Sequence, residues 1–256
     1  MSTIAFLGAT GGCTLAVLVR AVNAGTSCRA LVRTPSKLVK LLVEDKKVPQ
    51  EKVDQHLVIL QGDATSVEDV KKLFEGPAVS VVVSGIGAYP KMQASLTTPF
   101  TLEDPHLCTK SASSLIAALS SLPASMPKPI ITMISTTGIS AHPVYAGLKD
   151  VPFLLHSLYS WGLHVMHEDK RDAEEVLRQA AKERKSGGFV IVRASLLVDS
   201  ETGSKKTRVG WEEEGGKPAV GYTVGRDAVG EWIYEEVVKD EEKRKEWVGR
   251  HVTLTW

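Results

Sequence analysis

The fold is decided near the start of the chain, where the sequence reads Ile4-Ala5-Phe6-Leu7-Gly8-Ala9-Thr10-Gly11-Gly12-Cys13-Thr14. An apolar run typical of a buried strand passes through closely spaced glycines into a stretch with helical patterning. Gly8 permits a tight turn, while Gly11 and Gly12 let a ligand lie close to the backbone. A phosphate group in such a loop is stabilised by free N–H groups and by the positive end of the helix dipole. The stretch therefore predicts a strand, a phosphate-binding loop and a helix.

The same alternation of short apolar runs and amphipathic stretches continues through most of the 256 residues. It predicts strands at 3–7, 28–32, 57–60, 78–83, 130–134, 189–192, 222–224 and 251–255. It predicts helices at 13–24, 35–43, 66–74, 107–122, 152–161, 164–185 and 227–238. Strands that alternate with helices in this way form a parallel sheet with helices on both faces. We therefore predict a doubly wound, mostly parallel α/β fold of the Rossmann type, with a small C-terminal extension on the substrate side.

Length and charge limit the partners of such a fold. The 256 residues fit a single domain over 1–256, because domains typically span about 100–200 residues. The formal net charge of +1 supplies no basic field, so neither nucleic acid nor a membrane is an expected partner. A small-molecule substrate is the expected partner, and the protein is expected to be a homodimer or a monomer.

The spacing of the cysteines and the lengths of the apolar runs indicate the cellular compartment. Cys13, Cys28 and Cys108 lie far apart and form no pair at the spacing of metal ligands, so no metal site is expected. The apolar run at 3–8 is too short for a signal peptide and leads directly into glycines. No apolar run approaches the roughly 18 residues that span a bilayer. A cytoplasmic, reducing setting with free thiols is expected.

The residue after the second expected strand indicates which dinucleotide the loop binds. An acidic residue there would accept hydrogen bonds from the ribose hydroxyls of NAD and repel the 2′-phosphate of NADP. This chain has Arg33 at that position, followed by Thr34, Ser36 and Lys37. A planar cation with hydroxyls and a second cation beside it suits a phosphate group. We therefore expect NADP rather than NAD, the alternative being that Arg33 is only a solvated surface cation.

Two further strand ends and the helix start complete the expected cofactor site. Asp63, followed by Ala64, could accept a hydrogen bond from adenine or help to cap the next helix. At Ser84 and Gly85 the backbone can lie close to the ribose and phosphates, although a tight turn alone would also need the glycine. Thr14 stands where the usual GxxGxxG spacing has a third glycine, which predicts a slightly wider gap between helix and strand. The residues expected around the dinucleotide are Gly8, Thr10, Gly11, Gly12, Cys13, Thr14, Arg33, Ser36, Lys37, Asp63, Ala64, Ser84, Gly85 and Lys170.

The residues Ser-Thr-Thr-Gly at 135–138 follow the fifth expected strand, and Lys170 lies on the helix expected at 164–185. With the glycine loop and Arg33, these residues make the chain resemble the atypical short-chain dehydrogenases and reductases. It is most similar to the NmrA-like and biliverdin-reductase-B-like NAD(P)-binding proteins of fungal type. The resemblance covers nearly the whole chain, including residues 192–197 and 222–227. It implies a Rossmann fold, a nicotinamide cofactor and, in members that reduce carbonyls, a catalytic serine, tyrosine and lysine.

The catalytic group that this resemblance implies is only partly present. In such members a tyrosine and a lysine stand four residues apart on one helix face. The ammonium there lowers the pKa of the phenol and contacts the nicotinamide ribose. The residue four before Lys170 is Met166, which cannot donate a proton. The usual acid is therefore missing.

The remaining catalytic candidates are Lys170, Ser135, Thr136 and His167. Lys170 can still bind the ribose, and Ser135 or Thr136 can bind a substrate oxygen, because hydride transfer depends on geometry more than on an acid. The proton is left to His167, Tyr159 or water. His167 has an unperturbed pKa suited to proton transfer, the alternative being a histidine on the helix surface. Tyr159 is more typical of a packing aromatic.

Three functions remain open on these residues. The first is an NADP-dependent oxidoreductase acting on a small organic substrate with a carbonyl, quinone, flavin or tetrapyrrole-like group. The second, motivated by Met166, is a non-catalytic NADP-sensing regulator that resembles NmrA. The third is a non-redox isomerase or cyclase of secondary metabolism.

The substrate itself is not indicated by the sequence. Its pocket is expected from residues 88–105, 141–151 and 196–221, within substrate-side elements at about 139–165 and 196–225. None of these stretches carries a recognisable chemical motif. The polar, glycine-rich stretch 199–218 is expected to be a connection that carries substrate contacts or simply runs over the surface.

Overall fold

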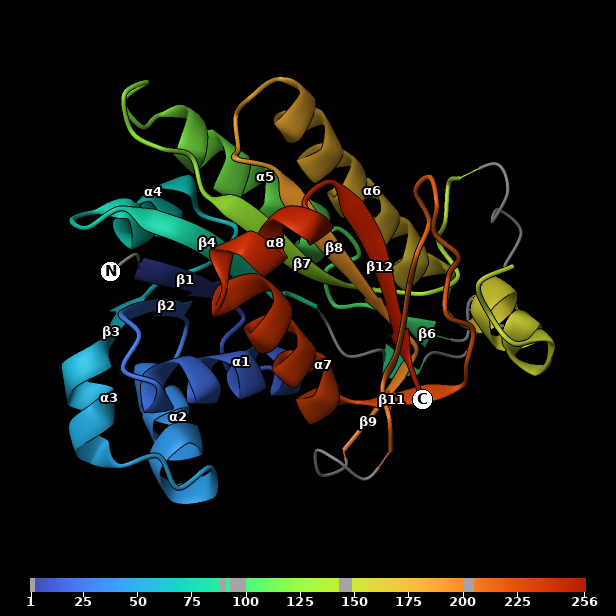
Figure 1. The fold of residues 1–256 in the computed structure, drawn as a ribbon, viewed down its shortest axis with the longest axis horizontal. Coiled ribbons are helices and arrows are strands. Elements are labelled where there is room, and N and C mark those ends of the chain that lie inside the picture. Colours follow the sequence, from blue (N-terminus) through green and yellow to red (C-terminus); the bar gives the residue numbers. More distant parts are fainter. Residues whose placement is uncertain (1–2, 88–90, 93–99, 143–148, 200–204) are drawn as a thin grey trace.

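An eight-stranded sheet forms the centre of the protein (Figure 1). The computed structural model describes residues 3–87, 91–92, 100–142, 149–199 and 205–256. Its strands are β1 (Thr3–Leu7), β2 (Cys28–Val32), β3 (Leu57–Gln61), β4 (Val79–Ser84), β7 (Ile130–Thr136), β8 (Phe189–Ala194), β10 (Arg208–Trp211) and β12 (Arg250–Thr255). Their order in space is β10-β12-β8-β7-β4-β1-β2-β3. Neighbours pair in parallel except β10 and β12, which are antiparallel. The predicted doubly wound Rossmann sheet is confirmed, with one antiparallel edge strand.

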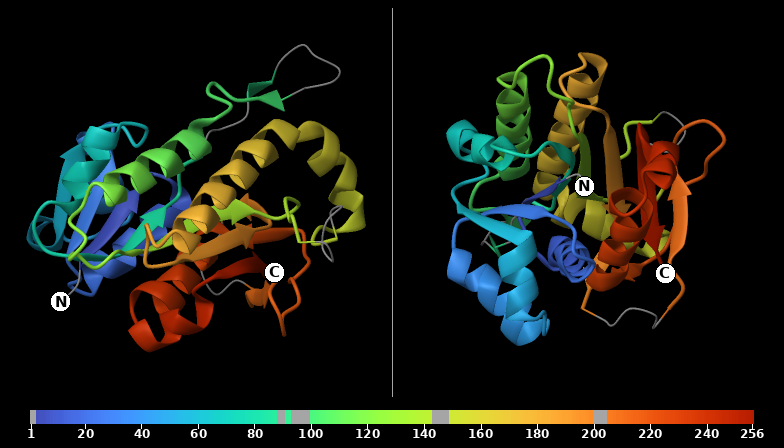
Figure 2. Two further views of the ribbon diagram at one scale, coloured as in Figure 1. Left: turned by 90° about the horizontal axis from the view of Figure 1, so that it is seen from above. Right: turned by 60° about the vertical axis from the view of Figure 1, so that its left-hand side comes forward.

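Helices cover both faces of this sheet (Figures 1 and 2). They are α1 (Gly12–Asn23), α2 (Pro35–Lys40), α3 (Gln50–His56), α4 (Val67–Lys71), α5 (Leu107–Ser120), α6 (His164–Lys182), α7 (Arg226–Ile233) and α8 (Glu241–Trp247). Helices α1, α2, α3, α7 and α8 pack on one face, whereas α4, α5 and α6 pack on the other. Short 3-10 or π-helical turns lie at Leu41–Asp45, Lys72–Phe74, Phe153–Leu155, Leu158–Gly162 and Tyr234–Val238.

Strand β1 shows how the sheet separates two cores. All of its residues are buried. Ile4 and Phe6 belong to the core beneath α1 and α7, whereas Ala5 and Leu7 belong to the core beneath α5 and α6. Successive side chains of a strand point to opposite faces, so a strand covered on both sides needs an unbroken apolar run. The run from Ile4 to Leu7 meets this need.

The strand order reverses at the carboxyl end of β1, which is where a sheet of this type has its ligand-binding crevice. That strand lies between β2 and β4, and the chain runs from β1 through β2 to β3 before it crosses back to β4. In an open parallel sheet, ligands bind outside the carboxyl ends of the strands at such a reversal. The glycine loop that follows Leu7 lies at this point, and the residues that follow β2, β3, β4 and β7 emerge along the same edge.

Helix α7 packs closely on the opening helix α1. A side chain at Gly230 would overlap Ala16 of α1, so the glycine permits the close crossing. Arg20 of α1 binds both carboxylate oxygens of Asp227, at the start of α7, with two hydrogen bonds of 2.9 Å. This contact brings residues near 226 to the glycine loop, more than 200 positions away in the sequence.

Several elements differ from the sequence prediction. Helices α3 and α8 are not predicted by the pattern, because both are short and mostly polar. Strand β10 forms within the polar stretch 199–218. The strand expected at 222–224 is β11 (Thr223–Gly225), which pairs with β9 (Leu196–Val198) outside the main sheet. The helix expected at 152–161 consists of two short turns. A further pair joins β5 (Lys91–Met92) and β6 (Phe100–Thr101).

Candidate functional site

The loop after β1 is made almost entirely of backbone. Gly8 has a φ of +74°, and a side chain there would come within 2.9 Å of the carbonyl carbon and oxygen of Gly85. The N–H of Gly11 donates to the carbonyl oxygen of Gly8 at 2.9 Å, which closes a tight turn. Thr10 is half-buried within the loop and Gly12 is exposed. The loop therefore presents a backbone surface rather than large side chains at the end of the sheet, and it packs closely on Gly85 and Arg226.

The first turn of α1 presents N–H groups to this surface. The first hydrogen bond of the helix runs from the N–H of Leu15 to the carbonyl oxygen of Gly11 at 2.8 Å. The N–H groups of Gly12, Cys13 and Thr14 therefore have no partner within the helix. No side chain caps the helix, and no acidic residue stands in its first turn. The positive end of the helix dipole is thus available to an anion.

Thr14 and Cys13 are both buried behind this surface. A side chain on Gly85 would overlap the hydroxyl oxygen of Thr14, so the glycine that follows β4 provides the space that a third loop glycine would otherwise give. Ser84, the last residue of β4, is half-buried. Burial raises the pKa of the Cys13 thiol to about 12, so the thiol stays protonated at neutral pH.

The end of β2 carries exposed polar groups. Arg33 directly follows this strand, and Arg33, Ser36 and Lys37 are all exposed. Arg33 lies near Asp63 at the end of β3. The pKa of Asp63 is lowered chiefly by hydrogen bonds from Thr65, and the charge of Arg33 lowers it further. The structure thus places an exposed guanidinium beside the crevice.

Asp63 shapes the turn that leads into α4. Its carboxylate accepts hydrogen bonds from the backbone N–H and the hydroxyl of Thr65, at 2.8 and 2.7 Å. The hydroxyl of Ser66 accepts the N–H of Asp69 at 3.3 Å and caps the helix itself. Ala64 between them is half-buried. Asp63 therefore stabilises the turn before α4, while the cap itself is Ser66, and a contact of Asp63 or Ala64 with adenine stays a prediction.

Lys170 of α6 joins the ends of two strands. Its Nζ donates to the carbonyl oxygen of Ile86, just after β4, at 2.7 Å. It also donates to the carbonyl oxygen of Ile134 in β7 at 2.8 Å. An ammonium group has three hydrogens, so these two bonds within the described part of the chain leave one for another acceptor. A fixed cation therefore lies at the carboxyl ends of β4 and β7, beside the crevice.

Ser135 is engaged in a buried ion-pair network. Its Oγ donates to Oε1 of Glu174 at 2.5 Å. Arg193 contacts Oε2 of Glu174 at 2.6 Å and Oε1 of Glu212 at 2.5 Å. Each of these four side chains is at most 5% exposed. The hydrogen of Ser135 is thus used within the protein, and its contact with substrate stays a prediction. Thr136, the next residue of β7, is half-buried.

His167 is a core residue. Its imidazole is only 6% exposed and lies 5.0 Å from the ring of Tyr159, measured between ring centroids. Burial lowers the pKa of His167 to about 4, and the charge of Arg171 contributes in the same direction. Burial thus moves the pKa of His167 away from the unperturbed value that suits proton transfer, and the alternative of a histidine on the helix surface is wrong. At neutral pH the imidazole carries no proton that it can readily donate.

Tyr159 is also a core residue, as its sequence context indicates. Its side chain is 2% exposed, and its hydroxyl lies 3.4 Å from the hydroxyl of Thr137. Burial raises the pKa of Tyr159 above its ordinary value. A catalytic phenol would instead need a lowered pKa and a contact with the substrate. Neither Tyr159 nor His167 has the properties of a ready acid in this structure.

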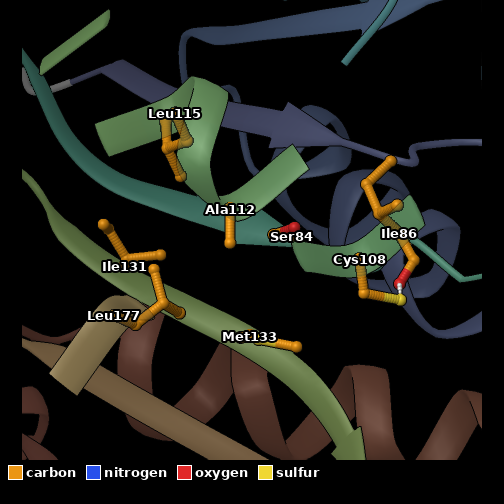
Figure 3. A pocket seen from close by; sticks show the side chains of 8 residues that line it. All are labelled: Ser84, Ile86, Cys108, Ala112, Leu115, Ile131, Met133 and Leu177. Carbon is orange, nitrogen blue, oxygen red and sulfur yellow. Dashed lines mark hydrogen bonds between the residues drawn. The ribbon is translucent and has the colours of Figure 1, made fainter. Parts of the chain in front are cut away.

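A small cavity lies between the end of the sheet and helices α5 and α6 (Figure 3). It is lined by Ser84, Ile86, Cys108, Ala112, Leu115, Ile131, Met133 and Leu177. Its volume of about 10 Å³ is the space of roughly one water molecule. This cavity is too small for an organic substrate. Of the segments expected to form the substrate pocket, residues 88–90, 93–99, 143–148 and 200–204 lie outside the described residues.

Arg226 lies beside the loop, and the sequence pattern does not predict it there. It begins α7, and its Cδ lies 2.5 Å from the point that a side chain on Gly12 would occupy. Its guanidinium forms an ion pair with Asp199 at 2.8 Å. Nothing in the spacing of residues 12 and 226 links them, since only the packing of α7 on α1 brings them together. The resemblance points to the segment but assigns no role to this side chain.

Metal ligands and membrane spans can be considered for the described residues only. Across the described ranges, no group of three or more His, Cys, Asp or Glu side chains could hold a metal ion. In the same part of the chain, no helix has both the length and the apolarity needed to cross a bilayer.

The loop fits the diphosphate of a dinucleotide. Gly8, Gly11 and Gly12 keep side chains off the loop, the first-turn N–H groups are uncapped, and no acidic residue stands in the first turn of α1. Fold and site together define a nucleotide-binding Rossmann protein. The model of the NAD(P)H-binding family matches residues 8–240, so the chain belongs to this family, within the atypical short-chain dehydrogenases and reductases.

Two curated fungal relatives match nearly the whole chain. "Reductase pytE" of Aspergillus terreus is 38% identical over 269 residues, which cover 99% of this chain and 98% of the relative. "Oxidase pynE" of Aspergillus niger is 37% identical over 286 residues, with the same coverage of the two chains.

Solved structures with low sequence identity share the fold. ChuY of Escherichia coli O157:H7, described as an anaerobillin reductase, has a TM-score of 0.65 at 14% identity and covers 99% of this chain and 96% of its own. Yeast methylglyoxal/isovaleraldehyde reductase Gre2, solved with NADPH, has a TM-score of 0.62 at 10% identity and covers 98% of this chain and 76% of its own. A putative NADH-flavin reductase of Streptococcus pneumoniae has a TM-score of 0.60 at 15% identity, covering 99% of both chains.

Proposed function

We propose that this protein is an NADP-dependent oxidoreductase that transfers hydride between the nicotinamide and a small organic substrate. The observation that carries the choice of NADP is Arg33, exposed at the end of β2 where an acidic residue would repel the 2′-phosphate. The names of both fungal relatives, a reductase and an oxidase, support redox chemistry. They leave the direction of hydride transfer open.

Different residues of the site would bind different groups of the cofactor. The first-turn N–H groups of α1 would hold the diphosphate, while Arg33 with Ser36 and Lys37 would bind the 2′-phosphate. Lys170, already fixed by two carbonyl oxygens, has one hydrogen left for the nicotinamide ribose. When bound, the nicotinamide supplies or accepts the hydride, which is the chemistry that the protein side chains lack.

The lack of a ready acid at positions 159, 166 and 167 favours a particular class of substrate. Met166 cannot donate a proton, His167 is neutral at pH 7, and the phenol of Tyr159 has a raised pKa. A simple ketone needs an acid close to its developing alkoxide. Quinones, flavins and tetrapyrroles delocalise the charge that hydride brings, so water can supply the proton later. We therefore propose an extended conjugated acceptor. The hydroxyl of the half-buried Thr136, which donates to the carbonyl oxygen of Thr137 at 3.2 Å, would turn to orient the acceptor's oxygen.

A panel of acceptors tests this function through the loss of NADPH absorbance. We expect turnover with a quinone, a flavin or a linear tetrapyrrole, and little with a simple ketone. Arg33→Gln should raise the KM for NADPH and leave the KM for NADH unchanged, because only NADPH carries the 2′-phosphate. Equal KM changes for both dinucleotides would contradict the role given to Arg33, and fast ketone reduction would contradict the proposed acceptor class.

A second candidate is a non-catalytic sensor of NADP, and the missing acid beside Lys170 is the observation that favours it. Tight binding of NADPH with no consumption across the acceptor panel would support the sensor. The third function, a non-redox isomerase or cyclase, would be supported by product formation while the NADPH concentration stays constant.

A further inference from the structure

We propose that Arg226 is a diphosphate-binding residue of the dinucleotide site, and that Asp199 competes with the diphosphate for its guanidinium. The proposal rests on the proposed function, since it concerns the same cofactor. It adds a cation from the far end of the chain to a site that otherwise binds the diphosphate through backbone alone.

The first observation is the position of the Arg226 side chain on the glycine loop. The carbon atoms Cβ, Cγ and Cδ of Arg226 all lie within 3.4 Å of the point that a side chain on Gly12 would occupy. Gly12 has no positive φ, so backbone strain does not explain a glycine there. The glycine instead makes room for the arginine, which crosses the loop at the first residue of α1.

The second observation is an electrostatic mismatch that an anion would relieve. The charges of Arg226 and of its partner Asp199 both act on buried Cys13, and the Cδ of Arg226 lies over Gly12, so this ion pair lies close to the first turn of α1. That turn is the positive end of the helix dipole and contains no acidic residue. A cation is unfavourable at such a place by itself. A diphosphate between the helix start and Arg226 would accept hydrogen bonds from the free N–H groups of α1 and would neutralise the guanidinium.

The third observation is the weakness of the present partner of Arg226. The side chain of Asp199 is 90% exposed, whereas that of Arg226 is 28% exposed. A solvent-exposed ion pair of this kind contributes little. A guanidinium binds phosphate oxygens more strongly, through two parallel charge-assisted hydrogen bonds. Exchange of Asp199 for the diphosphate is therefore favourable.

The backbone of Arg226 is held in place for this exchange. Gly230 permits the close crossing of α7 on α1, where an added side chain would overlap Ala16, so the first turn of α7 stays beside the loop. Only the end of the Arg226 side chain needs to turn. This geometry also assigns different phosphates to the two arginines, because Arg33 follows β2, whereas the side chain of Arg226, the first residue of α7, lies beside the start of α1.

Dinucleotide affinity, measured by titration calorimetry on the full chain, tests the proposal. Arg226→Gln should weaken NADPH and NADH alike by about tenfold or more, because both carry the diphosphate. Asp199→Asn should tighten both by about two- to fivefold, since it removes the competing carboxylate. ADP should lose affinity for Arg226→Gln, whereas adenosine 2′-monophosphate, which has no diphosphate, should bind as to the unmodified protein.

The matched control is Arg20→Gln. It removes an arginine–carboxylate pair from the same α1–α7 contact, but about 12 Å further along α1. Equal losses in the two variants would mean that Arg226 acts through packing, which overturns the proposal, as would unchanged affinities in Arg226→Gln. A loss for NADPH alone would overturn it by assigning the 2′-phosphate to Arg226. If the unmodified protein binds neither dinucleotide, the proposed function itself fails.

Discussion

The buried imidazole of His167 makes the stability of the fold depend on pH. Its pKa falls from an ordinary 6.5 to about 4, because burial disfavours the charged form. Between these values the unfolded chain binds a proton that the folded protein does not, so the free energy of unfolding decreases as the pH falls. A pKa lowered by one corresponds to about 1.36 kcal/mol, so the fall from 6.5 to about 4 corresponds to about 3 kcal/mol. Above pH 6.5 the group makes no contribution of this kind.

The perturbation that isolates this effect is His167→Phe, which keeps a ring against Tyr159 and removes the titrating group. Urea unfolding at pH 7 and at pH 4 gives the free energy of unfolding for each variant. We expect the unmodified protein to lose about 3 kcal/mol more than His167→Phe over this interval. His106→Gln, which changes an exposed imidazole, serves as the control and should follow the unmodified protein.

Equal pH dependence in His167→Phe and in the unmodified protein would refute this reasoning. The same variants also bear on catalysis. If His167 were the proton donor, His167→Phe would abolish turnover at neutral pH. We expect it to retain turnover with a conjugated acceptor, because the imidazole is already neutral there.

Two further substitutions test the packing behind the site by urea unfolding. Gly85→Ala should lose about 1–3 kcal/mol, because the added methyl overlaps the hydroxyl of Thr14, and Thr14→Ala in the same chain should restore part of that loss. Strictly additive effects of the two changes would contradict the contact. Arg193→Met should lose about 3–5 kcal/mol, because Glu174 and Glu212 would be left buried without their cation. A change below about 1 kcal/mol would show that the network contributes far less than its burial implies.

The parts of the fold that the sequence predicts are those with local causes. The run Ile4 to Leu7 is apolar at every position because β1 is covered on both faces, and the glycine loop follows it directly. The parallel sheet follows from the repetition of this unit. Helices α3 and α8 lack an apolar stripe long enough to be recognised, and β10 exists only because β12 pairs with it from 40 or more positions away.

In the candidate site, too, features with local causes are predictable and features that depend on packing are not. Gly8, Gly11 and Gly12 are predictable because backbone freedom is encoded in the residue type. The environment of Ser135 is not, because neighbouring strand residues point to opposite faces and the sequence does not say which face holds Glu174 and Arg193. His167 packs on Tyr159 of the preceding turn, a contact that the helical spacing within α6 does not indicate. Arg226 depends on the crossing of α1 and α7.

The most direct test of the central claim is a calorimetric titration of the purified protein with NADPH and with NADH. We predict binding of both, with NADPH at least about tenfold tighter, and loss of that preference in Arg33→Gln. Binding of NADH as tightly as NADPH would contradict the assignment of Arg33. Failure to bind either dinucleotide would contradict the placement of a nicotinamide cofactor at the start of α1.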